Sequence, residues 1–195
     1  MNLIEELKNY CDINNPVGAL MLSGEWGCGK TYLIKTKFIP SVKDTYVFVC
    51  ISLFGIDSLD KLRVEVKKKW LEKASEFDSL NGTKVSRVAD SCRRIFDTIK
   101  DRLPENWQKK GEVVSSIMDL INFMPISNRM FEKKVILVFD DLERTNISCT
   151  DLLGCINDYC ENQGFNTIIV ANEEKIKDRS DNELSYREIK EKIVP

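Results

Sequence analysis

Two stretches of the sequence contain residues whose types and spacing can do chemistry on a phosphate. The first, "LSGEWGCGKTYL" at 22–33, has the spacing G-x-x-x-x-G-K-T. This is the pattern of a phosphate-binding loop, in which the lysine ammonium reaches the outer phosphates and the hydroxyl binds Mg²⁺. We therefore predict Lys30 as a catalytic residue and Thr31 as a metal ligand. The residues predicted to contact the nucleotide are Gly24, Glu25, Trp26, Gly27, Cys28, Gly29, Lys30, Thr31 and Tyr32.

The second stretch, "VILVFDDLER", places carboxylates directly after an apolar run. Ligands of parallel sheets gather at the carboxyl ends of strands, so Asp140 is predicted as the second metal ligand. One of the following acids can orient or deprotonate the attacking water, and we favour Asp141 over Glu143 because it lies nearer the strand end. Arg144 is either an arginine finger or a salt-bridge partner.

A third polar residue ends another apolar run. Asn172 closes "TIIVAN" and faces the γ-phosphate if this strand lies between the strand before the loop and the strand that ends at Asp140. We predict a catalytic, polar-sensor role for its amide. An ordinary cap at the strand end is the alternative.

Four apolar, partly β-branched runs are the elements that must position these residues. Strands are predicted at 17–23, 44–54, 133–141 and 165–172. A helix is predicted directly after the loop, ending at Pro40, and an amphipathic helix at the N-terminus. A strand, a loop and a helix in this order direct backbone N–H groups at an anion, which argues against a chance match by a glycine-rich turn. The fold class is α/β.

A long polar tract at 56–132 separates the second predicted strand from the third. Its helical periodicity predicts a helical insertion, with a turn at Asn81-Gly82 and further breaks at Pro104 and Gly111. Residues 1–195 are predicted to form a single domain that contains this insertion. The slight excess of Lys and Arg in the insertion is better explained by a solvated helix face than by a nucleic-acid groove.

The composition excludes several classes of site. The chain has no histidine, so histidine catalysis and Cys/His zinc sites are excluded. Its seven cysteines form no C-x-x-C pair, which is typical of buried thiols in a reducing cytoplasm. Neither the N-terminal pattern nor any apolar run is typical of a signal peptide or a membrane span, so we expect neither, and the formal charge of −2 gives no overall attraction for nucleic acid. We expect a cytoplasmic protein without membrane attachment.

Four motifs together resemble the KAP P-loop NTPases, especially their soluble bacterial relatives: "GEWGCGKT", "SLFG" at 52–55, "VILVFDDLER" and "TIIVANEEKI". The resemblance implies an ASCE-type three-layer domain related to STAND and AAA+ ATPases, with the sheet order 5-1-4-3-2. It also implies that Asp140 binds Mg²⁺ and that Asp141 activates the attacking water. Many KAP proteins carry membrane helices within this domain, whereas the insertion here is polar. Some bacterial relatives act in phage defence.

The predicted function is binding of ATP and Mg²⁺ with slow hydrolysis that sets a conformation or assembly state. ATP is favoured over GTP because the sequence lacks an N-K-x-D guanine-reading motif. A nucleotide-dependent interaction module with little hydrolysis is the alternative. A nucleic-acid motor is a third reading, disfavoured by the near-neutral charge.

The end of the sequence carries one further expectation. The chain stops at 187–195, where the resemblance leads into a fifth strand beside the strand at 17–23. Because an unpaired apolar strand is a template for pairing, we expect a fragment of a longer protein, a protein partner or self-association. The alternative is an edge covered by the N-terminal helix, residues 2–11.

Overall fold

The computed structural model describes residues 2–81, 126–130, 132–177, 190–191 and 193. It divides into two compact units, one of Met1–Leu62 with Ser127–Pro195 and one of Arg63–Ile126. The second unit lies within the predicted insertion, of which α4 (Leu59–Asn81) is the described helix. The later helical periodicity and the breaks at Pro104 and Gly111 lie outside the described residues. That the chain is one domain with an insertion stays a prediction.

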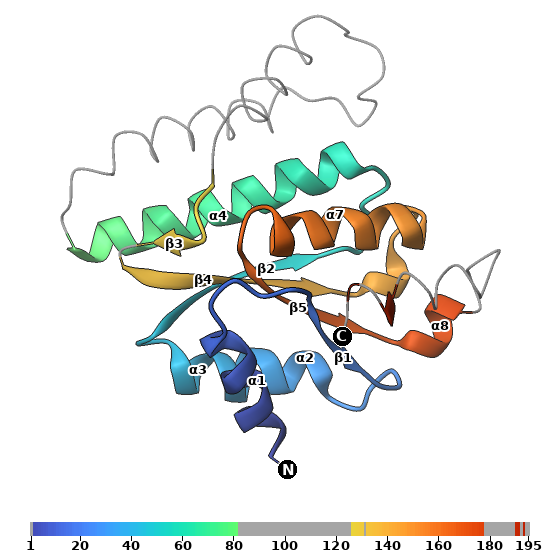
Figure 1. Cartoon of the computed structure of the whole chain (residues 1–195), viewed down its shortest axis with the longest axis horizontal. Coiled ribbons are helices and arrows are strands. Elements are labelled where there is room, and N and C mark those ends of the chain that lie inside the picture. The colour runs from blue at the N-terminus through green and yellow to red at the C-terminus, as the bar shows by residue number, and fades with distance from the viewer. Residues whose placement is uncertain (1, 82–125, 131, 178–189, 192, 194–195) are drawn as a thin grey trace, which may run out of the picture. The chain divides into compact units, whose positions relative to one another are not determined.

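A mostly parallel sheet forms the centre of the first unit (Figure 1). β1 (Leu20–Ser23), β5 (Asn166–Ala171), β4 (Lys133–Asp140) and β2 (Tyr46–Ser52) are parallel neighbours in this order, and β3 (Arg129–Met130) pairs antiparallel with β4. The order of the four parallel strands agrees with the predicted one, and each strand begins and ends within three residues of its predicted bounds. The short β3 was not predicted.

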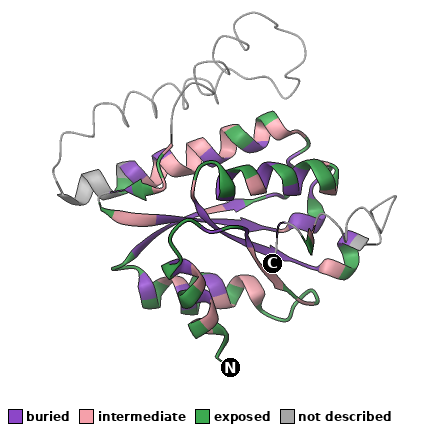
Figure 2. Ribbon diagram, in the orientation of Figure 1, coloured by how far each residue is buried: buried purple, intermediate pink, exposed green. Residues whose placement is uncertain are grey.

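The central strands are apolar because helices cover both of their faces. Every residue of β5 and the last six of β4 are buried, as Figure 2 shows. Continuous apolar runs of this kind are typical of parallel strands that are covered on both sides. The strand register pairs Ser52 with Asp140, Asp140 with Val170, and Ser23 with Ala171, so the polar residues at the strand ends lie along one edge.

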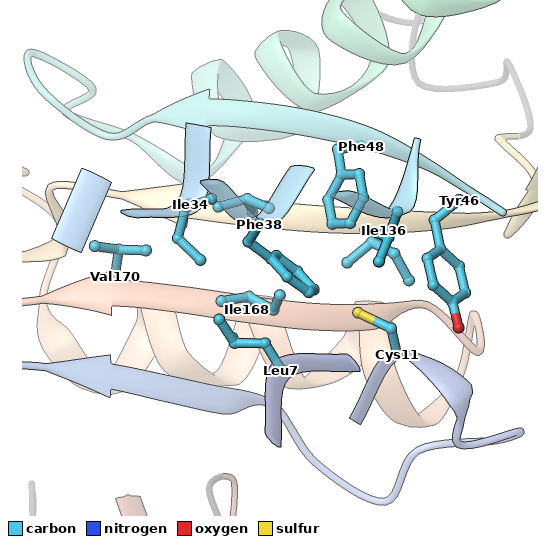
Figure 3. Packing of buried hydrophobic residues seen from close by; sticks show 11 residues of the cluster. Leu7, Cys11, Ile34, Phe38, Tyr46, Phe48, Ile136, Ile168 and Val170 are labelled. Atoms are coloured by element: carbon cyan, nitrogen blue, oxygen red, sulfur yellow. The ribbon is translucent and has the colours of Figure 1, made fainter. Parts of the chain in front are cut away.

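One face of the sheet is covered by α1 (Leu3–Asp12) and by the helical segment that follows the loop. This segment consists of α2 (Lys30–Tyr32), the π-helical turn η1 (Leu33–Phe38) and α3 (Ile39–Val42). Side chains from both helices pack on the sheet (Figure 3). The buried cluster consists of Leu7, Cys11, Ile34, Phe38, Val42, Tyr46, Phe48, Ile136, Val138, Ile168 and Val170.

The other face is covered by α7 (Cys149–Glu161). Tyr159 of this helix packs against Phe139 and Phe165, with ring centroids 6.1 and 6.2 Å apart. The chain therefore forms the predicted three-layer α/β arrangement. We did not predict α7, although Ser148 supplies an N-cap by accepting a hydrogen bond from the Asp151 N–H.

The predicted end of the loop helix at Pro40 was wrong, because the helical segment continues to Val42. Pro40 lies in the first turn of α3, where proline is tolerated because the backbone N–H that it lacks has no partner to lose. The preceding turn η1 is π-helical, and the Ile39 N–H donates to the Ile34 carbonyl. Isolated π-helical turns of this kind occur often at functional sites.

The start of β1 contacts two other parts of the chain. The Tyr10 hydroxyl of α1 donates to the Gly18 carbonyl at 2.8 Å, and the Ala19 N–H donates to the Ile193 carbonyl at 2.8 Å. One amide beside β1 is therefore paired within the chain. Whether a partner protein or a second copy pairs with the rest of this strand stays a prediction.

Candidate nucleotide-binding site

The predicted phosphate loop joins the end of β1 at Ser23 to the start of α2 at Lys30. Gly27 and Gly29 have positive φ angles of 79° and 89°, a region that side chains with a Cβ rarely adopt. A Cβ at either position would find open space, so the backbone conformation, and not crowding, explains these two glycines. The loop thus turns back on itself before the helix begins.

A cavity of about 250 Å³ lies between the loop and the ends of β4 and β5. Of the predicted site residues, Gly24, Glu25, Cys28 and Asn172 are not among its lining residues. The lining residues are Trp26, Gly27, Gly29, Lys30, Thr31, Tyr32, Asp140, Asp141, Glu143, Arg144, Val170 and Ala171. The structure therefore brings the two motifs found in the sequence to one cavity.

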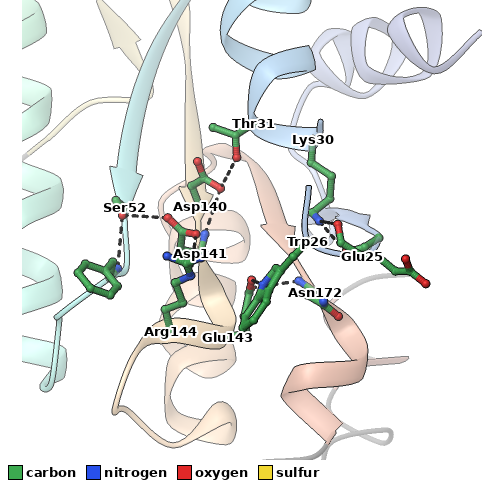
Figure 4. Close-up of polar contacts among 12 residues, drawn as sticks. Glu25, Trp26, Lys30, Thr31, Ser52, Asp140, Asp141, Glu143, Arg144 and Asn172 are labelled. Carbon is green, nitrogen blue, oxygen red and sulfur yellow. Dashed lines mark hydrogen bonds and ion pairs between the residues drawn. The ribbon is translucent and has the colours of Figure 1, made fainter. Parts of the chain in front are cut away.

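The Lys30 ammonium is held inside its own loop. It donates to the carbonyl oxygens of Gly24 at 2.6 Å and Glu25 at 2.8 Å (Figure 4). These partners are neutral, so the positive charge of Lys30 is hydrogen-bonded but not neutralised by them. A phosphate in the cavity would offer Lys30 a stronger, charged acceptor.

Thr31 and Asp140 both line the cavity and contact each other. The Thr31 hydroxyl donates to the Asp140 Oδ1 at 3.0 Å, and the Asp140 residue is 5% exposed. A hydroxyl and a carboxylate are oxygen donors of the kind that Mg²⁺ prefers, so the residues present fit the predicted ion. The Lys35 ammonium lies 3.4 Å from Asp140 Oδ2 and offsets its charge. We did not predict Lys35, which is four residues after Thr31 and thus on the same helix face.

Asp141 adopts a left-handed backbone conformation, with a φ of 62°. The Ser52 hydroxyl donates to its Oδ2 at 3.3 Å, and Arg144 Nε lies 3.4 Å from its Oδ1. Ser52 belongs to the "SLFG" motif, but no role was predicted for it. Arg144 therefore makes the ion pair that was one of its two predicted roles. Its guanidinium also lies over the rings of Trp26, at 5.3 Å, and Phe54, at 5.8 Å.

Glu143 lies in the 3₁₀ turn η3 (Leu142–Arg144) and is 7% exposed. Its Oε1 accepts a hydrogen bond from Trp26 Nε1 at 2.6 Å, and its Oε2 accepts one from the Asn172 N–H at 3.0 Å (Figure 4). Burial favours a higher pKa, but these two hydrogen bonds stabilise the carboxylate, and the pKa of Glu143 lies below its ordinary value.

Asn172 is buried at the end of β5, before α8 (Glu173–Lys177). Its side-chain oxygen accepts from the Lys175 N–H at 3.4 Å, which is the contact expected of a cap. The catalytic sensor role of Asn172 stays a prediction.

Comparison with protein families agrees with this geometry. The model described as "KAP family P-loop domain" matches residues 2–195. No curated protein matches the chain. Among the helices that the structure describes, none has the length and apolar character needed to cross a membrane. The matched region covers nearly the whole sequence and includes every residue of the cavity, so the chain belongs to the KAP family of P-loop domains.

Proposed function

We propose that this domain binds ATP with Mg²⁺ and hydrolyses it slowly, using the bound nucleotide to set a conformation or an assembly state. The contact between Thr31 and Asp140 carries the proposal, because it joins the residue after the loop lysine to the end of β4 in the cavity that Lys30 also lines. Family membership supports a nucleotide as the ligand. The choice of ATP rests on the missing guanine-reading motif in the sequence.

The residues have distinct roles in the proposed reaction. Thr31 and Asp140 would hold the metal ion, which neutralises charge on the phosphates when bound. Lys30 would exchange its two loop carbonyls for phosphate oxygens and stabilise the charge that develops on them. Asp141 would orient a water molecule for in-line attack on the γ-phosphate and accept its proton.

The interactions of Asp141 also support the alternative, an interaction module with little hydrolysis. Each carboxylate oxygen of Asp141 already has a partner, Ser52 for one and Arg144 for the other. A base held in this way must change its contacts before it accepts a proton, and that requirement favours a low basal rate. Both readings share the nucleotide site and differ in turnover.

The wider role is also a proposal. We propose a cytoplasmic protein that works with a protein partner or a second copy of itself, and the family resemblance suggests phage defence. Ile13 and Val17 support a partner, because these apolar residues before β1 are 47% and 74% exposed. Sedimentation of the chain with and without ATP tests self-association, and a monomer at all concentrations in both conditions would argue against it.

Two substitutions test the proposed reaction. Lys30→Ala should raise the Kd for ATP with Mg²⁺ by about tenfold or more, because it removes a charge-assisted contact. Asp141→Asn should leave the Kd within about threefold but lower turnover by about 10²-fold or more. Titration calorimetry with ATP and GTP and a phosphate-release assay provide the readouts.

Lys37→Ala is the matched control for the lysine variant, since Lys37 is exposed on the same helical segment and does not line the cavity. Wild-type protein that binds neither nucleotide would refute the proposed function. If Asp141→Asn retains wild-type turnover, Asp141 is not the base.

A further inference from the structure

Glu143 lies between two segments that are far apart in the sequence. One oxygen of its carboxylate accepts from the Trp26 indole of the phosphate loop, and the other accepts from the backbone N–H of Asn172 at the end of β5. The Trp26 partner is 117 positions away. A buried side chain thus joins the middle of the loop to the sheet, in addition to the backbone hydrogen bond that the Gly24 N–H donates to the Ala171 carbonyl at 3.3 Å.

This connection differs from the others that the loop makes. Lys30 also holds the loop, through the carbonyls of Gly24 and Glu25. Those two bonds use donors of the ammonium that would also serve the phosphates of a bound nucleotide. The bond between Trp26 and Glu143 involves no group that the phosphates need, so it can persist in the nucleotide-bound state.

The surroundings of Glu143 suit a structural anchor better than a proton acceptor. Glu143 is 7% exposed, and the hydrogen bonds from Trp26 and Asn172 both stabilise the ionised form. Transfer of a proton to this carboxylate would weaken both contacts at once. Asp141 is in a different position, because its carboxylate is about a third exposed, and its partners, the Ser52 hydroxyl and the partly exposed Arg144 guanidinium, lie at 3.3 and 3.4 Å.

We propose that Glu143 is a positioning residue that anchors the phosphate loop to the end of β5 through Trp26 and the Asn172 amide. It fixes the loop for nucleotide binding, and it does not accept the proton of the attacking water. The inference rests on the proposed function for its kinetic consequences, but the anchor itself can be tested without nucleotide.

Two substitutions test the anchor, one by changing the donor of the hydrogen bond between Trp26 and Glu143 and the other by changing its acceptor. Trp26→Phe removes the indole N–H but keeps an aromatic ring beneath the Arg144 guanidinium. Glu143→Gln keeps one acceptor oxygen and replaces the other by an NH₂ group, so it can satisfy only one of the two donors. The Trp26 residue is 55% exposed, so Trp26→Phe preserves the core even if Glu143→Gln destabilises the fold.

The first experiment is hydrogen exchange of the full chain without nucleotide. Trp26→Phe should accelerate exchange in the loop residues 24–29, and Glu143→Gln should accelerate it in the loop or at the Asn172 amide, whichever donor the single Gln oxygen leaves unsatisfied. Glu161→Gln, the same change on an exposed acid at the end of α7, should accelerate neither. Unchanged exchange in both segments would refute the anchor. This result does not depend on whether the protein binds a nucleotide.

The second experiment measures ATP binding and turnover in the presence of Mg²⁺. Each single variant should raise the Kd and the KM by about tenfold, and the double variant should be no worse than either, because both remove the same contact. At saturating ATP the kcat should stay within about threefold of wild type. A loss of kcat at unchanged Kd in Glu143→Gln, or a raised kcat in Trp26→Phe, would identify Glu143 as the base and overturn the proposal.

If the wild type binds no nucleotide, the proposed function fails, and the exchange experiment still decides whether the anchor exists.

Discussion

At the scale of single residues, the charged side chains of the site have partners within the protein in place of the nucleotide and the metal ion that we propose they bind. The Lys35 ammonium lies beside the buried Asp140 carboxylate, and the Lys30 ammonium is held by carbonyl oxygens of its own loop. A buried charge without a partner is costly, and these contacts lower that cost. The proposed ligands would offer the same groups charged partners of their own.

Cys28 allows ligand binding to be followed by chemical labelling. It is exposed in the loop, with its sulfur 3.7 Å from the Lys30 ammonium. Burial raises the pKa of Cys11 to about 12 and that of Cys160 to about 11, so those thiols should react slowly. Iodoacetamide should therefore modify Cys28 first among the cysteines that the structure describes, and ATP with Mg²⁺ should slow the reaction.

Mass spectrometry of the labelled peptides provides the measurement. Cys149, which is partly buried outside the cavity, is an internal control whose labelling should not respond to nucleotide. Equal labelling of Cys28 with and without nucleotide would count against the loop assignment.

At the scale of elements, the segments with local signals were predictable. The strands have continuous apolar runs, and the glycines with the Lys-Thr pair identify the loop, so the sheet and the meeting of the two motifs at one end of it could be predicted before the structure was known. The course of the helical segment at Pro40 was mispredicted, because a π-helical turn and a new helix start at proline depend on packing of Ile34 and Phe38 in the core.

The contacts of the site were less predictable than its elements. Hydrogen bonds join Trp26 to Glu143 and Ser52 to Asp141 across 117 and 89 positions of sequence. No local pattern specifies which of several carboxylates near a strand end will meet which donor. The strand order and the strand register decide these pairings. A shift of the register by one residue would turn each side chain of the strand to the other face of the sheet.

Phe38 is one of the buried side chains that pack the helical segment on the sheet. It is fully buried and meets Phe48 of β2 edge to face, with centroids 5.5 Å apart. Phe38→Ala should lower the free energy of unfolding by about 3–5 kcal/mol, because it leaves a cavity and removes the aromatic contact. Urea denaturation checks this value.

Val17→Ala is the control for that experiment, since Val17 is 74% exposed and its truncation should change the free energy by less than about 0.5 kcal/mol. A loss below about 1 kcal/mol for Phe38→Ala would mean that the helix packs on the sheet differently.

At the scale of the whole molecule, the candidate site depends on the parallel sheet, because the carboxyl ends of parallel strands all lie at the same end of the sheet. The register places Ser52, Asp140 and Val170 side by side, and the loop after β1 closes the same end. The nucleotide site and the stability of the first unit therefore depend on the same contacts. Glu143 is a clear case, because its two hydrogen bonds connect the loop, η3 and the end of β5.

This dependence predicts how the stability of the molecule varies with pH. The pKa of Glu143 is lower in the folded protein than its ordinary value: burial alone would raise it, but the hydrogen bonds from Trp26, from the Asn172 N–H and from its own backbone, together with the charge of Lys30, lower it further than burial raises it. A lowered pKa means that the ionised group stabilises the fold at neutral pH, with the full contribution present above about pH 4.3. The contribution is lost as the pH falls through the folded pKa.

The measurement is the difference in free energy of unfolding between wild type and Glu143→Gln, determined by urea denaturation at several pH values. This difference should stay constant from about pH 7 to pH 5 and shrink below about pH 4.3. Protonation of Glu143 then removes from the wild type the stabilisation by the ionised carboxylate, which the variant lacks at every pH. Glu161→Gln, on an exposed acid, should differ little from wild type throughout. A difference that grows on acidification would mean that Glu143 is held in the folded protein as the neutral acid, and the anchor would then have to be a different hydrogen bond.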